Sequence, residues 1–121
     1  MTARNRRMTL TFAFNYGARA ELVDAARSIA REARARRLQP DKINERTLAR
    51  HLYASDMPDP DLLIRTSGEY RISNFLLWQL AYSELVFTDV LWPDFRRQHL
   101  FEAIAEFQRR ERRFGAVEED D

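Results

Sequence analysis

The sequence predicts an α/β fold with a mostly parallel sheet and helices on its faces. Three segments have the apolar or alternating pattern of short strands, at residues 8–14, 62–65 and 85–87. Longer segments between and after them carry apolar residues at helical spacing. The resulting order, βααβαβα, alternates strands with helices, and such alternation is typical of a parallel sheet.

Length and composition set the outer limits. The 121 residues suit one domain, residues 1–121, ending in an acidic tail at 116–121. Twenty basic and nineteen acidic residues nearly cancel, so net charge indicates no class of partner. The absence of cysteine excludes a disulfide framework and a thiolate site. No apolar run approaches the ~20 residues of a membrane span, and no signal-peptide pattern precedes the first strand, so we expect a cytoplasmic protein.

The first half of the chain predicts one strand and two helices. Asn15-Tyr16-Gly17 closes the strand at 8–14 with turn residues. The helix expected at 18–37 has an apolar stripe and an arginine-rich face, and Leu38-Gln39-Pro40 ends it. Asn44 is a good N-cap for a shorter helix that continues to Tyr53.

The centre of the sequence predicts an anion site. The strand at 62–65 ends on Arg65 and leads into a loop, residues 66–73, that contains Gly68 and Arg71. A buried helix is expected at 75–82, with Ser73 or Asn74 as its cap. In open α/β sheets, a strand, a glycine loop and a helix start form sites for anions. Two arginines there favour a ligand that carries phosphate or diphosphate.

The helix expected at 75–82 needs more surrounding structure than the other predicted elements can supply. It is apolar at every position except Gln79, which indicates burial nearly all round. The remaining elements, a strand at 85–87, a turn at 92–94 and a helix at 96–113, are too few to cover it. The chain is therefore expected to be half of a larger fold, or to complete its core with a partner.

Each candidate site residue also has a structural interpretation. Arg65 and Arg71 could instead form ion pairs with Glu69 or Asp61, and Ser73 could serve only as a helix cap. Glu84 follows a long apolar run, where a carboxylate is costly unless it meets a cation or hydrogen-bond donors. From the residues alone, a metal ligand and a solvated carboxylate at the strand edge remain equal alternatives for Glu84.

The motif RTSGEYRISNFLLWQLAYSELVFTDVLWPDF at 65–95, followed by RRERRFG at 109–115, resembles the carboxyl-terminal half of the undecaprenyl diphosphate synthases. These enzymes form the cis-prenyltransferase (isoprenyl transferase) family. The resemblance extends back through Asn15-Tyr16-Gly17 to Thr2, with Ala18 where the family commonly has glycine. The family's amino-terminal segment, with its Asp-Gly-Asn phosphate loop, has no counterpart, so the resemblance implies no catalytic residue in this chain.

The resemblance implies a transferase that condenses isopentenyl diphosphate with an allylic diphosphate, such as farnesyl diphosphate, forming a cis double bond and releasing diphosphate. It also implies a homodimer or a full-length homologous subunit, and peripheral membrane contact for the lipid product. By resemblance, the site residues are Arg65, Arg71 and Ser73 for isopentenyl diphosphate, Glu84 for Mg²⁺, Arg113 and Gly115 for the partner's active site across the dimer, and Met8 for the wall of the product tunnel.

Two other classes of function stay open at this point. A non-catalytic subunit could keep the dimerising half of the fold and regulate a full-length prenyltransferase. A nucleic-acid binder is suggested only by the arginine face at 18–37, and the neutral net charge and the acidic tail oppose it. We therefore expect diphosphate ligands and no nucleic acid.

Overall fold

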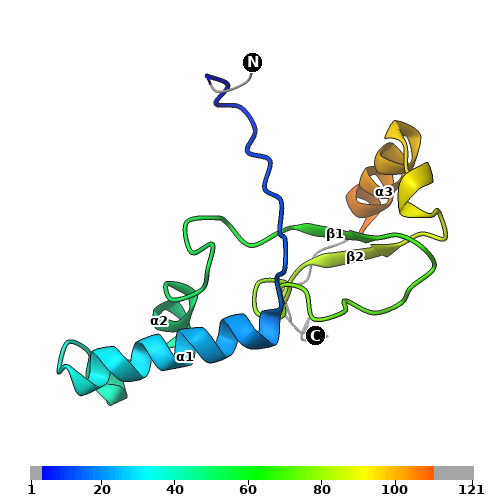
Figure 1. Cartoon of the computed structure of the whole chain (residues 1–121). Helices are drawn as coiled ribbons and strands as arrows, with labels where there is room; N and C mark the ends of the chain where they lie inside the picture. The colour runs from blue at the N-terminus through cyan, green and yellow to red at the C-terminus, as the bar shows by residue number, and fades with distance from the viewer. Residues whose placement is uncertain (1–3, 111–121) are drawn as a thin grey trace, which may run out of the picture.

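The computed structural model describes residues 4–110 (Figure 1). Two helices, α1 and α2, lie on one side of the molecule, and a two-stranded sheet with α3 lies on the other (Figure 1). The elements are α1 (Ala18–Arg34), α2 (Glu45–Ala49), β1 (Leu62–Arg65), β2 (Glu84–Phe87) and α3 (Arg97–Arg109), with 3-10 turns at Pro40–Lys42 and Trp92–Asp94.

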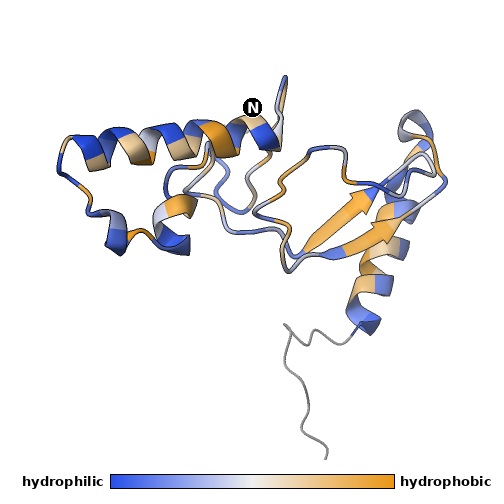
Figure 2. Ribbon diagram, turned by 90° about the horizontal axis from the view of Figure 1, so that it is seen from below, coloured by the Kyte–Doolittle hydropathy of each residue, from blue (hydrophilic) through white to orange (hydrophobic). Residues whose placement is uncertain are grey.

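The two strands pair in parallel, which confirms the predicted α/β class. Leu62 lies opposite Glu84, and Arg65 lies opposite Phe87. Figure 2 shows that both strands are apolar over most of their length and that α3 lies beside them. Val86 of β2 and Ala103 of α3 are buried, since α3 packs against β2. This layer gives the sheet one covered face.

Three of the four predicted helices form, and each ends earlier than predicted. α1 begins after Gly17 as predicted and ends at Arg34. Asn44 caps α2 by accepting a hydrogen bond from the Thr47 amide at 3.0 Å, and Thr47 Oγ1 accepts one from the Asn44 amide at 3.3 Å. This reciprocal cap satisfies two amide groups, which explains why even a short helix starts there. Among the described residues, no helix is long and apolar enough to cross a membrane.

The strand predicted at residues 8–14 is wrong. The segment is extended but pairs with no strand among residues 4–110, and it projects away from the rest of the chain (Figure 1). Its large apolar side chains, those of Met8, Leu10, Phe12 and Phe14, are 70–85% exposed. A strand needs a neighbour for its backbone groups and a layer against its apolar face. The described part of the chain supplies neither.

The helix predicted at residues 75–82 is also wrong, and the segment is a series of turns. Ser73, Asn74 and Leu76 have φ values of 49°, 61° and 46°, which a right-handed helix excludes. A helix that is apolar all round needs complete burial, whereas Leu77 and Tyr82 are exposed here. The first strand and the third helix of the predicted βααβαβα order are therefore missing from the observed element order.

Candidate functional site

The carboxyl end of β1 leads into a loop that is fixed to the segment after β2. The Arg65 carbonyl accepts a hydrogen bond from the Thr88 amide at 2.9 Å, and the Gly68 amide donates to the Thr88 carbonyl at 3.0 Å. The Ser67 amide donates to the Val90 carbonyl at 2.8 Å. These bonds extend the pairing of the two strands and hold the start of the loop beside the end of β2.

Gly68 is required at this bend for two reasons. Its φ of 65° lies in the left-handed region, which residues with a side chain rarely adopt. A Cβ atom there would also lie 3.2 Å from Asp89 Oδ1, which is a tight contact. The predicted glycine bend is thus confirmed as a feature of the backbone.

The two arginines of the predicted anion site differ in their contacts. Arg71 forms an ion pair with Glu69, so the structural alternative is the observed state for this residue. Its side chain is 69% exposed, and such surface pairs contribute only about 0–1 kcal/mol. Arg65 has no ion pair within residues 4–110, and its buried Nε has no hydrogen-bond partner there. A buried N–H group without an acceptor is costly, so Arg65, unlike Arg71, keeps a donor that no group within residues 4–110 uses.

Ser73 and Asn74 do not cap a helix at residue 75, because no helix begins there. Asn74 instead caps α1. Its carbonyl accepts a hydrogen bond from the Ala18 amide at 2.8 Å, and its side-chain Oδ1 accepts one from the Arg19 amide at 2.9 Å. Ser73 is exposed beside this contact. The loop that begins at Arg65 therefore ends against the N-terminus of α1.

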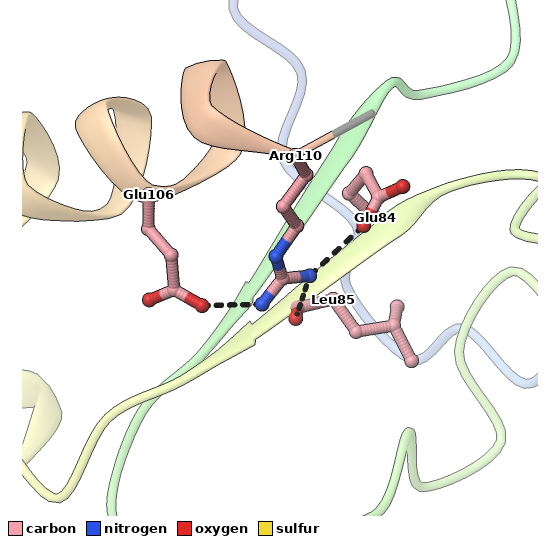
Figure 3. Close-up of polar contacts among 4 residues, drawn as sticks. All are labelled: Glu84, Leu85, Glu106 and Arg110. Atoms are coloured by element: carbon pink, nitrogen blue, oxygen red, sulfur yellow. Dashed lines mark hydrogen bonds and ion pairs between the residues drawn. The ribbon is translucent and has the colours of Figure 1, made fainter. Parts of the chain in front are cut away.

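Glu84 is bound by an arginine that the sequence did not indicate. Arg110 Nη1 lies 2.9 Å from Glu84 Oε2 and donates to the Leu85 carbonyl at 2.8 Å, while Nη2 pairs with Glu106 (Figure 3). The hydrogen bonds to Glu84 and Glu106 raise the pKa of Arg110. Glu84 is thus ion-paired rather than a solvated carboxylate at the strand edge. Its second oxygen points away from Arg110 (Figure 3).

The structure does not bring Glu84 and Arg65 together. Glu84 begins β2, opposite Leu62, whereas Arg65 ends β1, opposite Phe87. The two positions are offset by three residue steps along the strands, roughly 10 Å at the usual rise per residue. Within residues 4–110, no three His, Asp or Glu side chains gather as a metal site. Mg²⁺ commonly takes only one or two carboxylates together with phosphate oxygens, so the magnesium role of Glu84 stays a prediction.

A buried carboxylate on α1, Glu21, forms the main polar cluster that the sequence reasoning missed. It is 1% exposed. Tyr16 Oη donates to its Oε2, the Tyr53 amide donates to its Oε1 at 2.9 Å, and Gln79 Nε2 lies 3.4 Å from both oxygens. Glu21 lies on the buried stripe of α1, together with Ala18, Ala25 and Ile29. An acidic residue among the apolar positions of the predicted helix was the signal in the sequence that could have indicated this cluster.

Tyr16 makes the stability of this cluster sensitive to alkaline pH. Burial, and then the hydrogen bond to Glu21, raise the pKa of Tyr16 above that of a free phenol. The neutral phenol is therefore favoured in the folded state. Its contribution is complete below the unfolded pKa of about 10, and it is lost as pH rises through the higher folded pKa.

We expect Tyr16→Phe to lose about 1 kcal/mol of unfolding free energy at pH 7, because one partly exposed hydrogen bond to a carboxylate disappears. Urea unfolding at pH 7 and pH 10.5 should show a smaller pH-dependent loss in this variant than in the unmodified chain. Tyr70→Phe is the control, since Tyr70 is 74% exposed and should keep the original loss. Equal losses in Tyr16→Phe and the unmodified chain would contradict this prediction.

Of the remaining predicted site residues, Met8 alone lies in the described part of the chain, and it is far from the loop in sequence. Met8 is 79% exposed on the extended segment at 8–14. Arg113 and Gly115 lie outside the described residues. The structure therefore relates only Arg65, Arg71 and Ser73 to one continuous loop, with Glu84 at the far end of β2.

Comparison with known proteins identifies the family. Residues 1–115 match the family model described as "Putative undecaprenyl diphosphate synthase". The chain is 59% identical over 116 residues to isoprenyl transferase 1 of Streptomyces coelicolor, covering 96% of this chain and 42% of that protein. It is 54% identical over 118 residues to a trans,polycis-polyprenyl diphosphate synthase ((2Z,6E)-farnesyl diphosphate specific) of Thermobifida fusca. This match covers 98% of this chain and 42% of that protein.

Solved structures agree with this assignment. Lavandulyl diphosphate synthase from Lavandula x intermedia, solved with dimethylallyl diphosphate, superimposes with a TM-score of 0.81 and 46% identity, covering 84% of this chain and 44% of that one. A probable undecaprenyl diphosphate synthase from Campylobacter jejuni superimposes with a TM-score of 0.68 and 37% identity, again covering 84% of this chain and 44% of that one. The chain thus spans less than half the length of these relatives. It belongs to the undecaprenyl diphosphate synthase family of cis-prenyltransferases.

Proposed function

We propose that this chain contributes the isopentenyl diphosphate site of a cis-prenyltransferase, which condenses isopentenyl diphosphate with farnesyl diphosphate or a longer allylic diphosphate to make a polyprenyl diphosphate. The observation that carries the proposal is the unpartnered, buried Nε of Arg65 at the glycine bend of a chain from this family. The farnesyl diphosphate in the name of the T. fusca relative and the dimethylallyl diphosphate in the lavender structure support the substrate class.

In this proposal, three side chains of the loop bind the diphosphate. Arg65 offers a forked set of donors that matches diphosphate oxygens. Arg71 exchanges Glu69 for the ligand, which costs little because the pair is at the surface. Ser73 adds a hydroxyl donor. The loop bonds from Ser67 and Gly68 hold the first of these groups at the end of β1.

We further propose that Glu84 is one ligand of Mg²⁺, which neutralises diphosphate charge as the leaving group departs. Glu84 and Glu106 both pair with Arg110, so they form a matched pair for a test. Titration of Mg²⁺ into the chain with inorganic diphosphate should show weaker Mg²⁺ binding for Glu84→Gln and unchanged binding for Glu106→Gln. Equal changes in both variants would assign the effect to Arg110 and overturn the proposed ligand role.

Calorimetry and an incorporation assay test the proposed function. We expect saturable binding of isopentenyl diphosphate to the chain, with competition by inorganic diphosphate. Incorporation of labelled isopentenyl diphosphate with farnesyl diphosphate and Mg²⁺ should require a second polypeptide that supplies the part of the S. coelicolor relative preceding the matched region. The absence of isopentenyl diphosphate binding would overturn the proposal, and turnover by the chain alone would overturn the requirement for a second polypeptide.

A dimerising or regulatory subunit is the second candidate, and the exposed apolar side chains of residues 8–14 favour it. Four large apolar side chains on one extended segment are an unusual surface for a monomer. We propose that a second copy or a homologous subunit covers this segment. Sedimentation should show dimers or larger species, and a stable, compact monomer would contradict this.

A further inference from the structure

We propose that Asn74 is a positioning residue that holds the diphosphate loop against the N-terminus of α1, and that Gly17 permits this contact by having no side chain. The inference rests on the proposed function, because it explains how Ser73 and Arg71 are placed. Neither Asn74 nor Gly17 is assigned a contact with substrate.

Asn74 is connected to α1 by two hydrogen bonds over a long sequence distance. The Ala18 amide donates to the Asn74 carbonyl at 2.8 Å, and the Arg19 amide, 55 residues away in sequence, donates to Oδ1 at 2.9 Å. The first amides of a helix lack partners within the helix. Gly17, the N-cap residue of α1, has no side chain with which to satisfy them. Asn74 therefore serves as the cap of α1 from another part of the chain.

Gly17 is required for space and not for backbone conformation. Its φ of −143° is extended backbone that any residue can adopt. A Cβ atom on Gly17, however, would lie 3.0 Å from Asn74 Nδ2. This is tighter than nine in ten real contacts of a Cβ atom, so the Asn74 amide would have to shift by a few tenths of an ångström. Movement of the amide would weaken its bond to the Arg19 amide.

The backbone around Asn74 needs an external anchor. Ser73, Asn74 and Leu76 all lie in the left-handed region, with φ of 49°, 61° and 46°. Such conformations cost about 1–2 kcal/mol each for residues other than glycine, and asparagine tolerates them best. They persist only where surrounding contacts determine them. The two bonds from α1 supply that constraint at the residue next to Ser73.

Further contacts support the same arrangement. The Tyr16 and Phe75 rings meet edge to face at 5.7 Å, and Gln79 reaches the buried carboxylate of Glu21 on α1. Asn74, Phe75 and Gln79 thus all contact α1 or Tyr16, which lies just before it. The orientation of Ser73, which precedes all of them, is set by α1 rather than by the sheet.

Calorimetric titration with isopentenyl diphosphate tests this inference in two variants of the chain. Asn74→Gly removes the Oδ1 acceptor while still allowing a positive φ, and Gly17→Ala leaves every polar group in place. We expect each to weaken the affinity about tenfold, because a charge-assisted hydrogen bond from the loop loses its alignment. The double variant should be no weaker than either single variant, since both act on one contact.

Asn44→Ala is the matched control. Asn44 also caps a helix through its side chain, in α2, and its loss should cost a similar amount of stability without changing the affinity. Unfolding curves would verify that all variants are folded at the temperature of the titration.

Unchanged affinity in Asn74→Gly and Gly17→Ala would overturn the positioning role alone. Additive losses in the double variant would overturn the link between Gly17 and Asn74. If the unmodified chain binds no isopentenyl diphosphate, the proposed function and the positioning role fail together.

Discussion

Glu21→Ala is expected to lower the free energy of unfolding by about 3–5 kcal/mol, the largest effect of any single substitution considered. The carboxylate is buried on α1 and accepts hydrogen bonds from Tyr16 Oη and the Tyr53 amide. Its removal leaves these donors without an acceptor and opens a cavity. The backbone amide of Tyr53 cannot reorient to find another acceptor, so its lost hydrogen bond is the share of the free energy that relaxation recovers least.

Urea unfolding followed by circular dichroism would measure this effect. Asp24→Ala is the control, because Asp24 lies one turn further along α1 and also accepts a hydrogen bond from Tyr53, but at the surface. It should cost less than about 1 kcal/mol. Glu21→Gln should fall between the two, since the amide keeps one acceptor oxygen and the shape of the side chain. Similar losses in Glu21→Ala and Asp24→Ala would show that the buried cluster does not stabilise the fold.

Arg65→Ala is expected to weaken isopentenyl diphosphate binding by about 1.5–3 kcal/mol, the range for hydrogen bonds to charged groups. This corresponds to roughly a tenfold to 150-fold increase in the dissociation constant. The physical reason is the unpartnered Nε of Arg65, which gives the residue a donor that no internal acceptor uses. Arg71→Ala should have a smaller effect, because Arg71 must first leave Glu69.

Two comparisons make the Arg65 prediction specific. Arg50→Ala removes the same charge from an exposed position at the end of α2 and should leave the affinity unchanged. Arg65→Lys keeps the charge but loses the forked geometry, so it should recover only part of the affinity. Calorimetry that gives equal affinities for the unmodified chain and Arg65→Ala would remove the proposed diphosphate site.

Local signals were sufficient for several elements. Asn44 caps α2 through contacts within four residues of sequence, and the apolar run before Arg65 forms β1. Gly68 marks the bend because its left-handed backbone and its approach to Asp89 both favour glycine. These features depend on neighbouring residues and on residue type, and both are visible in the sequence.

Contacts over long sequence distances were not predictable in the same way. Arg110 binds Glu84 from 26 residues away, and Asn74 caps α1 rather than a helix of its own. The segments at 8–14 and 75–82 have strand and helix patterns, but such patterns form the element only where other layers cover them.

The residues themselves were enough to establish the α/β class, the family and the arginine–glycine loop after β1. Backbone propensity and residue chemistry act locally, and the family motifs are long. The three-dimensional arrangement decided which arginine keeps an unused donor, which carboxylates are paired and where the loop is anchored. Those outcomes depend on which groups meet after folding, because a hydrogen bond or an ion pair is set by distance in space and not by separation along the chain.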